Sequence, residues 1–247
     1  MRQVPKNKTE FSYLIVGSGK LSKHLQNYFT LKNISYKVWN RHSDIQFESL
    51  ALDAKYILVL ISDDAIVEFI KKYKSKPLEE KIWIHCSGML STPLAESAHP
   101  LMSFIDSLYN LETYESISFI TEKDRKTFKD LFPALSNKSY EIDKDEKVFY
   151  HAMCVLSGNF TAFIWKYFFE YLKSQNISES AAKVYLKMVA ENLMRNDNPL
   201  TGPIQRNDEK VIEKHIDALN GSPMRNIYLA FLDTYNAMKK EKLNEIN

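Results

Sequence analysis

Along the first half of the chain, short apolar segments typical of strands take turns with segments that have the hydrophobic spacing of helices. Short apolar runs typical of strands occupy seven segments: Tyr13–Val16, Tyr36–Trp39, Tyr56–Ile61, Lys81–His85, Ala98–Phe104, Ile117–Thr121 and Ser139–Ile142. Helical spacing follows the first and third runs, with one face made of Leu21, Leu25 and Tyr28 and another of Ile66, Phe69 and Ile70. A further helix is predicted over 123–135. This alternation is typical of a mostly parallel sheet covered by helices on both faces.

Strand patterns cease after about Asp143, and only helical patterns follow. A long helix is predicted from near Lys144 to Lys173, and a second from Ser178 to about Met194. A third helix follows Asn207 and ends at Asn220-Gly221; a fourth opens with Ser222-Pro223, a cap residue followed by proline at the first helical position. We therefore expect two domains, 1–143 and an all-helical 144–247.

The turn after the first strand carries the chain's most informative motif, Gly17-Ser18-Gly19. In a strand–turn–helix unit, two such glycines permit a tight turn and a close approach of backbone to a pyrophosphate, which the N–H groups at the helix start can bind. Ser22 takes the place of the usual third glycine, and it is small enough for close helix–strand contact. The sequence therefore predicts an α/β protein with a Rossmann-type doubly wound, mostly parallel sheet at 1–143, followed by the helical domain. Cofactor contacts are expected at Gly17, Ser18, Gly19, Lys20, Leu21 and Ser62.

The residues that follow the second strand indicate which cofactor is bound. Proteins that bind NAD usually have an acidic residue there, which accepts hydrogen bonds from the ribose hydroxyls. This chain has Asn40 and then Arg41, whose planar guanidinium suits a 2′-phosphate, and His42 can add a contact. We therefore expect NADP(H). Asp44 leaves an alternative open, because an acid one step further along can still reach a ribose, and Arg41 can also be an ordinary solvent-exposed arginine.

Composition narrows the class of protein. The net charge is only +2, with 33 basic and 31 acidic residues, so no charge excess favours nucleic acid. Neither Cys86 nor Cys154 belongs to a CxxC motif, which argues against a metal site or a disulfide framework. The use of cysteine favours a location in the reducing cytoplasm. The first ten residues lack the apolar stretch of a signal peptide. Residues 148–165 carry no Asp, Glu, Lys or Arg, and their polar groups favour a helix buried in protein over a membrane span.

Polar residues that can carry chemistry cluster in four places. Ser87 follows the fourth strand at the edge where open α/β sheets bind ligands, and His85 precedes it. The others are His99, before Pro100; His151 and Asn159, eight residues apart on the long helix; and Arg206, in a loop that runs into a helix. Proton transfer or substrate binding is one interpretation for the histidines, and a buried hydrogen-bonding role is the other. Arg206 suits a substrate carboxylate or phosphate.

Five motifs occur in an order and spacing that resemble the Rossmann-like oxidoreductases with a C-terminal domain of unknown function. They are GSGKLS, HCSG, AHPLMSF, YHAMCVLSGN and LTGPIQRND. The resemblance spans about Ser12 to Tyr235 and extends in architecture to pyrroline-5-carboxylate reductase and ketopantoate reductase. It implies an NADP-type cofactor at Gly17, Gly19 and Arg41, and a helical domain like that of 6-phosphogluconate dehydrogenase, often used for dimerisation. β-Hydroxyacid dehydrogenases have a catalytic lysine four residues before an asparagine on the long helix; Val155 holds that position here.

Together these features predict a cytoplasmic NADP(H)-dependent oxidoreductase that acts on a small carbonyl, hydroxy or imino compound in an interdomain cleft. We expect Ser87, His99, His151 and Asn159 to be catalytic, and His85 and Arg206 to bind substrate. We expect a homodimer that forms through the helical domain. We expect no binding to nucleic acid, to membranes or to metal ions. Two alternatives remain: a catalytically silent NADP(H)-binding protein, and an oxidoreductase of aromatic acids similar to prephenate dehydrogenases, which have a comparable His-Pro element.

Overall fold

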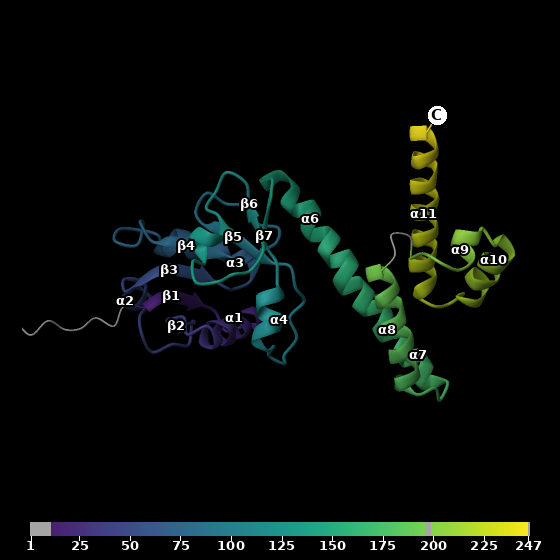
Figure 1. Ribbon diagram of the computed structural model, residues 1–247, viewed down its shortest axis with the longest axis horizontal. Helices are drawn as coiled ribbons and strands as arrows, with labels where there is room; N and C mark the ends of the chain where they lie inside the picture. Colours follow the sequence, from purple (N-terminus) through teal and green to yellow (C-terminus); the bar gives the residue numbers. More distant parts are fainter. Residues whose placement is uncertain (1–10, 196–198, 247) are drawn as a thin grey trace, which may run out of the picture. The chain divides into compact units, whose positions relative to one another are not determined.

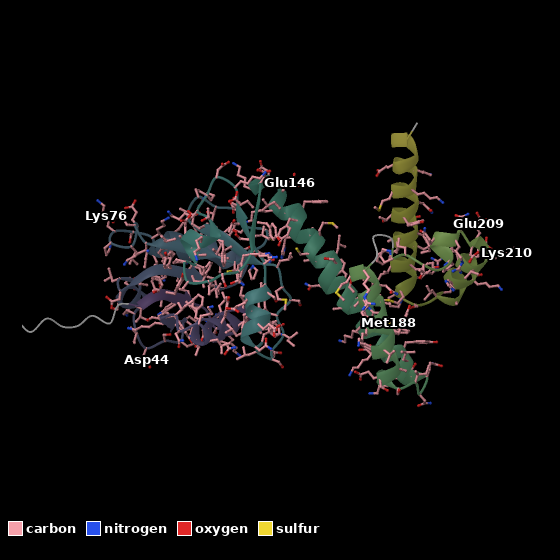
Figure 2. The ribbon with its side chains drawn as sticks, in the orientation of Figure 1. Asp44, Lys76, Glu146, Met188, Glu209 and Lys210 are labelled. Atoms are coloured by element: carbon pink, nitrogen blue, oxygen red, sulfur yellow. The ribbon has the colours of Figure 1, made fainter. Side chains whose placement is uncertain are left out.

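The computed structural model describes residues 11–195 and 199–246, with the side chains of Phe11 and of 242–246 left out (Figures 1 and 2). Contacts within the chain divide it into two units between Lys166 and Tyr167. Strands end at Ile142, and all regular structure after it is helical. The predicted domain boundary at 143/144 therefore follows the last strand, whereas the division by contacts falls within a helix; the boundary itself stays a prediction.

The first unit is built on one seven-stranded sheet in the order β2-β1-β3-β4-β5-β6-β7. The strands are β1 (Phe11–Val16), β2 (Tyr36–Trp39), β3 (Ala54–Val59), β4 (Ile82–His85), β5 (Glu96–Pro100), β6 (Phe119–Glu122) and β7 (Ser139–Ile142). Every neighbouring pair is parallel except β5 and β6. Since β1 lies between β2 and β3, the strand order reverses at β1, and this reversal places the ligand edge of the sheet there.

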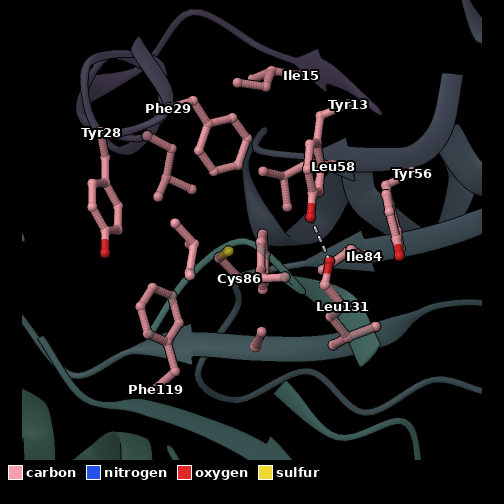
Figure 3. Close-up of a cluster of buried hydrophobic side chains, with 14 of the residues drawn as sticks. Tyr13, Ile15, Tyr28, Phe29, Tyr56, Leu58, Ile84, Cys86, Phe119 and Leu131 are labelled. Atoms are coloured by element: carbon pink, nitrogen blue, oxygen red, sulfur yellow. Dashed lines mark hydrogen bonds between the residues drawn. The ribbon is translucent and has the colours of Figure 1, made fainter. Parts of the chain in front are cut away.

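Helices cover both faces of the sheet through two apolar clusters. One cluster joins strand residues to α1 (Lys20–Leu31), α4 (Leu111–Ser116) and α5 (Phe128–Leu131). In it the Tyr13 hydroxyl donates to the Leu131 carbonyl at 2.8 Å (Figure 3). The other cluster joins the opposite face to α2 (Phe47–Ala51) and α3 (Asp63–Tyr73). Burial of apolar side chains on both faces explains why β1 and β3 are continuous apolar runs.

Four elements of the first unit differ from the sequence expectation. The helix predicted over 123–135 is reduced to α5, because Thr127 caps it through Asp130 and Pro133 follows its end. The strand predicted over Ala98–Phe104 ends at Pro100. The short helices α2 and α4 have too few turns to produce a periodic pattern.

The long helix begins with a 3₁₀ turn, η1 (Lys144–Glu146), and continues as α6 (Lys147–Cys154), a π-helical segment η2 (Val155–Phe160) and α7 (Thr161–Ser174). In the single chain, Phe149, Met153, Phe160 and Phe163 of this helix are each at least 46% exposed. Lys144–Ser174 is long and apolar enough to cross a membrane by length and composition, and its most apolar window has no buried residue. The expected burial of this helix in protein stays a prediction.

The second unit contains the end of α7 and four further helices. They are α8 (Glu179–Arg195), α9 (Pro203–Arg206), α10 (Glu209–Ala218) and α11 (Met224–Ile246). Hydrogen bonds hold parts of this unit together, including His215 Nδ1 with the Tyr228 hydroxyl at 3.0 Å and the Tyr235 hydroxyl with Gln205 Oε1 at 2.8 Å. The predicted helices are present, and α9 is an addition that begins at Pro203.

Candidate functional site

A cavity of about 890 Å³ lies at the carboxyl ends of four neighbouring strands. Its lining follows the sheet from the end of β2 (Trp39–Arg41) through the β1 turn (Val16–Ser22) and the end of β3 (Val59–Asp63) to Cys86 and Ser87 after β4. Side chains of α3 complete it: Ala65, Ile66, Phe69, Lys72 and Tyr73. This is the edge where open α/β sheets bind their ligands. Of the expected cofactor contacts, all but His42 line the cavity.

The glycines of the β1 turn have the two distinct roles that their spacing predicts. Gly17 has φ +118°, and a Cβ there would lie 2.2 Å from the Leu60 carbonyl oxygen, so only glycine fits. A Cβ at Gly19 would meet no atom within 4 Å, which leaves open space in front of the first turn of α1. Ser22, in the third position of the motif, is fully buried and donates to the Gly17 carbonyl at 2.7 Å. The turn therefore fits a bound pyrophosphate.

The loop after β2 holds Arg41 at the edge of the same cavity. Asn40 Oδ1 accepts from the His42 N–H at 2.9 Å, and the Ser43 hydroxyl accepts from the Asn40 N–H at 3.0 Å. The Arg41 Nε donates to His42 Nε2 at 3.2 Å, so His42 supports the arginine and does not itself line the cavity. Asp44 is exposed and is also absent from the lining (Figure 2). The Arg41 guanidinium therefore lies at this edge of the cavity with His42, and not a carboxylate, as its hydrogen-bond partner.

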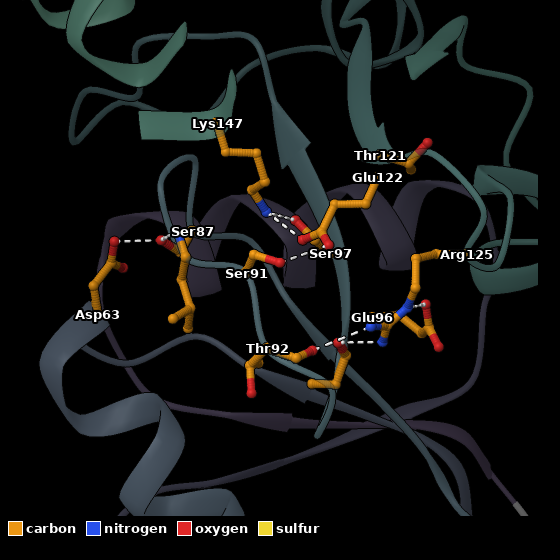
Figure 4. Close-up of polar contacts among 12 residues, drawn as sticks. Asp63, Ser87, Ser91, Thr92, Glu96, Ser97, Thr121, Glu122, Arg125 and Lys147 are labelled. Atoms are coloured by element: carbon orange, nitrogen blue, oxygen red, sulfur yellow. Dashed lines mark hydrogen bonds and ion pairs between the residues drawn. The ribbon is translucent and has the colours of Figure 1, made fainter. Parts of the chain in front are cut away.

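Ser87 lies at the β4 end of the cavity and has two partners. Its hydroxyl donates to the Asp63 carboxylate and accepts from the Leu90 N–H at 3.1 Å (Figure 4). Ser87 is 6% exposed, and Asp63 begins α3 and faces the cavity. Asp63 was not among the expected site residues. Its position as the first residue of a helix after a strand end is the signal that could have identified it.

A second cavity, of about 390 Å³, collects three of the expected catalytic residues: His99, His151 and Asn159. Its other lining residues are Leu101, Met102, Ser103, Cys154, Val155, Ser157 and Gly158. They come from the segment after β5 and from α6 and η2, whose π-helical turn is a feature frequent at functional sites. Ser87 lines the first cavity only, so the structure divides the four expected catalytic residues between two cavities.

Gly88 brings these two groups together. A Cβ at Gly88 would lie 2.5 Å from Cδ2 of His151 and 3.1 Å from Nε2 of His99, so both imidazoles pack directly on its backbone. Because Ser87 precedes Gly88, the β4 end of the first cavity adjoins the two histidines of the second. The His99 and His151 rings are perpendicular, with centroids 5.8 Å apart.

The electrostatics around His99 keep its imidazole neutral. Burial, together with the neighbouring His151 and Lys147, lowers the pKa of His99 to about 4. The Tyr150 hydroxyl lies 2.8 Å from His99 Nδ1, and burial raises the pKa of Tyr150. Tyr150 lies within the YHAMCVLSGN motif but was not assigned a role, because its partner is 51 residues earlier in the chain.

A buried ion pair anchors the helix that carries His151. Lys147, the first residue of α6, donates to Glu122 at 2.7 Å and to the Ser97 hydroxyl at 2.6 Å (Figure 4). The second Glu122 oxygen accepts from the Ser91 hydroxyl at 2.9 Å. The Lys147 and Glu122 side chains are only 3% and 5% exposed. This network ties α6 to β5 and β6 and so fixes the position of Tyr150 and His151 against the sheet.

His85 lies inside the sheet and lines neither cavity. It is fully buried on β4, between β3 and β5, and neither ring nitrogen has a hydrogen-bond partner among the described residues. Burial, with the positive charges of Lys147 and Arg125, lowers the pKa of His85 to about 3. Because the imidazole must stay neutral in this position, its placement fits a structural role better than contact with substrate.

This pKa shift predicts a specific loss of stability in acid. Between about pH 6.5 and pH 3 the unfolded chain binds a proton at His85 that the folded chain does not, so the free energy of unfolding falls as the pH falls through this window. At about 1.4 kcal/mol for each pKa unit, the loss is on the order of 5 kcal/mol. His85→Leu should flatten this part of the profile in urea unfolding at several pH values. His42→Leu, at an exposed histidine, should leave the fall in the free energy of unfolding unchanged. Equal pH profiles for the two variants would contradict the account.

Arg206 belongs to the second unit and is described there alone. It is exposed, and its guanidinium pairs with Asp208 through Nε at 3.0 Å and Nη2 at 2.9 Å. Asp208 precedes α10, but its side chain makes no capping bond; it is the partner of Arg206. The expected contact of Arg206 with substrate stays a prediction.

Three solved structures share this fold over nearly the whole chain. Protein BF3122 from Bacteroides fragilis is 20% identical, with a TM-score of 0.73, and the match covers 92% of this chain and 98% of that one. A reductive aminase from Aspergillus terreus, in complex with NADPH and ethyl levulinate, is 15% identical, with a TM-score of 0.62 and coverages of 94% and 95%. The pyrroline carboxylate reductase of Plasmodium falciparum, with NADP bound, is 13% identical, with a TM-score of 0.58 and coverages of 94% and 98%.

The sequence itself is similar to one family model, a domain of unknown function (DUF2520), over residues 116–234. No curated protein matches the sequence. The structural likenesses confirm the predicted fold class: a Rossmann-type, mostly parallel sheet with flanking helices, followed by a helical region. At these identities they establish the fold, and the chemistry must be argued from the site.

Proposed function

We propose that this protein is an NADP(H)-dependent oxidoreductase that acts on a small carbonyl, hydroxy or imino compound. The observation that carries the proposal is that a cavity with the position and turn of a dinucleotide site adjoins, at Ser87 and Gly88, a smaller cavity lined by two imidazoles. Two proteins of the same fold, the reductive aminase and the pyrroline carboxylate reductase, have structures with NADPH or NADP bound. Their likeness supports the assignment of the larger cavity.

The lining of the larger cavity assigns a part of the cofactor to each strand end. The open space at Gly19 and the N–H groups of the first turn of α1 would hold the pyrophosphate. Arg41 would bind the 2′-phosphate through its guanidinium, and Ser87 would lie at the nicotinamide end. When bound, the cofactor supplies or accepts the hydride. The chain's own residues would position the substrate and transfer a proton to or from it. The proposed catalytic residues are Ser87, His99, His151 and Asn159.

The first test of this function is cofactor preference. NADPH should bind at least tenfold more tightly than NADH, because a charge-assisted bidentate contact is worth roughly 1.5–3 kcal/mol. Fluorescence titration of both cofactors measures the ratio. Arg41→Ala should remove the preference, while Lys76→Ala, an exposed cation outside the lining, should leave it intact. Equal affinities for the two cofactors in the parent protein would rule out the assignment to NADP(H).

We also propose that the protein works as a homodimer in the cytoplasm, joined through its helical part. Apolar side chains of α6, η2 and α7 are exposed, and apolar patches of this extent mark interaction surfaces. This supports the proposal that a second copy of the chain packs against them. Both described cysteines, Cys86 and Cys154, are unpaired, which suits a reducing compartment.

Light scattering at micromolar concentration should therefore give the mass of a dimer. Phe163→Glu should produce monomers, because it places a charge in the proposed interface, where Phe163 is 52% exposed in the single chain. Tyr140→Glu is the matched control: Tyr140 is 57% exposed but lies on the edge strand β7 and not on these helices. A monomeric parent protein would contradict the proposal, and recovery of the parent in the membrane fraction would show that lipid covers the helix.

A further inference from the structure

His99 and Tyr150 form a pair whose geometry determines how His99 presents itself to the second cavity. His99 lies on β5, and Tyr150 lies on α6, where the Lys147 network holds the helix against the sheet. The Tyr150 hydroxyl is 2.8 Å from His99 Nδ1, and the two rings are nearly perpendicular, at 81°. A hydrogen bond at Nδ1 decides which nitrogen of a neutral imidazole carries the proton.

A second pair in the same unit has the same arrangement and can be interpreted without ambiguity. The Tyr114 hydroxyl is 2.9 Å from His24 Nδ1, and His24 Nε2 is 2.8 Å from the Ile105 carbonyl oxygen. Because a carbonyl oxygen can only accept, the proton of neutral His24 must be on Nε2, and Nδ1 then accepts from Tyr114. His24 is therefore an internal reference for the Nε2–H form beside a tyrosine.

The neighbours of Tyr150 favour the same direction of hydrogen bonding at His99. The thiol of Cys154, one helical turn later, also acts on the Tyr150 hydroxyl and helps to raise its pKa. An imidazole nitrogen is a far better acceptor than a thiol sulfur, so the phenol proton is donated to His99 Nδ1. Burial raises the pKa of Tyr150, which keeps that proton on the phenol near neutral pH.

The opposite edge of the His99 ring carries Nε2. This atom lies 3.1 Å from the position of a Cβ at Gly88, beside the His151 ring, and His99 lines the second cavity. In the His24 pair, a carbonyl oxygen is the partner of Nε2. An Nε2–H group on His99 needs an acceptor in the corresponding place, and a ligand in the second cavity can supply it.

We propose that Tyr150 is a positioning residue that holds neutral His99 as the Nε2–H tautomer, so that His99 donates a hydrogen bond to a carbonyl oxygen of the substrate. The substrate class is then a carbonyl compound and not an iminium ion, which would offer a donor to a donor. The assignment of the acceptor as substrate rests on the proposed oxidoreductase function. Since burial lowers the pKa of His99 to about 4, the imidazole acts near pH 7 as a neutral donor that polarises the carbonyl, a role documented for neutral histidine in other enzymes.

Nuclear magnetic resonance of the full chain, labelled with ¹⁵N-histidine and free of cofactor, tests the tautomer directly. His99→Gln and His24→Gln assign the two sets of signals. At neutral pH, His99 should show the same pattern as His24, with the proton on Nε2. Tyr150→Phe should abolish this single-tautomer pattern at His99 and leave His24 unchanged. Tyr114→Phe should leave His24 as Nε2–H, because the Ile105 carbonyl remains.

A proton on Nδ1 of His99, a mixture of tautomers in the parent protein, or a His99 pattern unaffected by Tyr150→Phe would overturn the proposal. If Tyr150→Phe fails to fold, which loss of the His24 signals would reveal, the parent spectrum alone decides. The measurement uses no NADPH and no turnover. Failure of the tautomer assignment is therefore distinguishable from failure of the proposed oxidoreductase function.

Discussion

Gly17→Ala should lower the free energy of unfolding by about 3 kcal/mol or more and abolish NADPH binding. The backbone at Gly17 has φ +118°, which costs an L side chain on the order of 1–3 kcal/mol, and the new Cβ would lie 2.2 Å from the Leu60 carbonyl oxygen. Relief of that contact would force apart β1 and β3, two central neighbours of the sheet. Chemical denaturation and fluorescence titration measure the two effects.

Gly19→Ala is the matched variant. Its Cβ meets no atom within 4 Å and its φ of −71° suits any residue, so the stability should remain within about 1 kcal/mol of the parent. The methyl group would occupy the space assigned to the pyrophosphate, and NADPH affinity should fall at least tenfold. Unchanged affinity in a folded Gly19→Ala variant would show that the pyrophosphate does not bind at this turn.

Lys147→Met should lower the free energy of unfolding by about 3–5 kcal/mol, because it leaves the buried Glu122 carboxylate without its cation. The double variant Lys147→Met with Glu122→Leu should recover most of this loss, since both charges leave together. Urea unfolding of the parent, both single variants and the double variant completes the cycle.

The Lys123–Asp143 pair supplies the control for that cycle. Its nitrogen–oxygen distance is also 2.7 Å, but its side chains are 49% and 59% exposed. Lys123→Met should leave the urea midpoint near that of the parent, because solvent screens an exposed pair. A Lys147→Met midpoint equally close to the parent would contradict the account of a buried network that anchors α6.

Local patterns were sufficient to predict most of the first unit. The apolar runs of β1 and β3, the glycine turn between β1 and α1, and the periodic face of α1 each follow from residues close in sequence. The residues that line the larger cavity were predictable for the same reason: a parallel strand, a glycine turn and a helix place them at one edge of the sheet whatever the rest of the chain does.

Features that depend on distant residues were not predictable from the sequence. Tyr150 and His99 are 51 residues apart, and Lys147 and Glu122 are 25 apart; each pair exists only because α6 packs against β5 and β6. His85 has the sequence context of a site residue, but its place within β4 buries it in the sheet. The exposed apolar side chains of the long helix form a surface whose cover the sequence of the helix alone does not identify.

The most direct test of the central claim is hydride transfer from NADPH to a set of small aldehydes and ketones, followed by the nicotinamide absorbance. The account predicts a decrease in absorbance that requires both protein and carbonyl compound and is lost in Gly19→Ala. Tight binding of NADPH without oxidation by any carbonyl or imine would contradict the enzymatic claim and identify a binding protein. Failure of NADPH to bind at all would contradict the account as a whole.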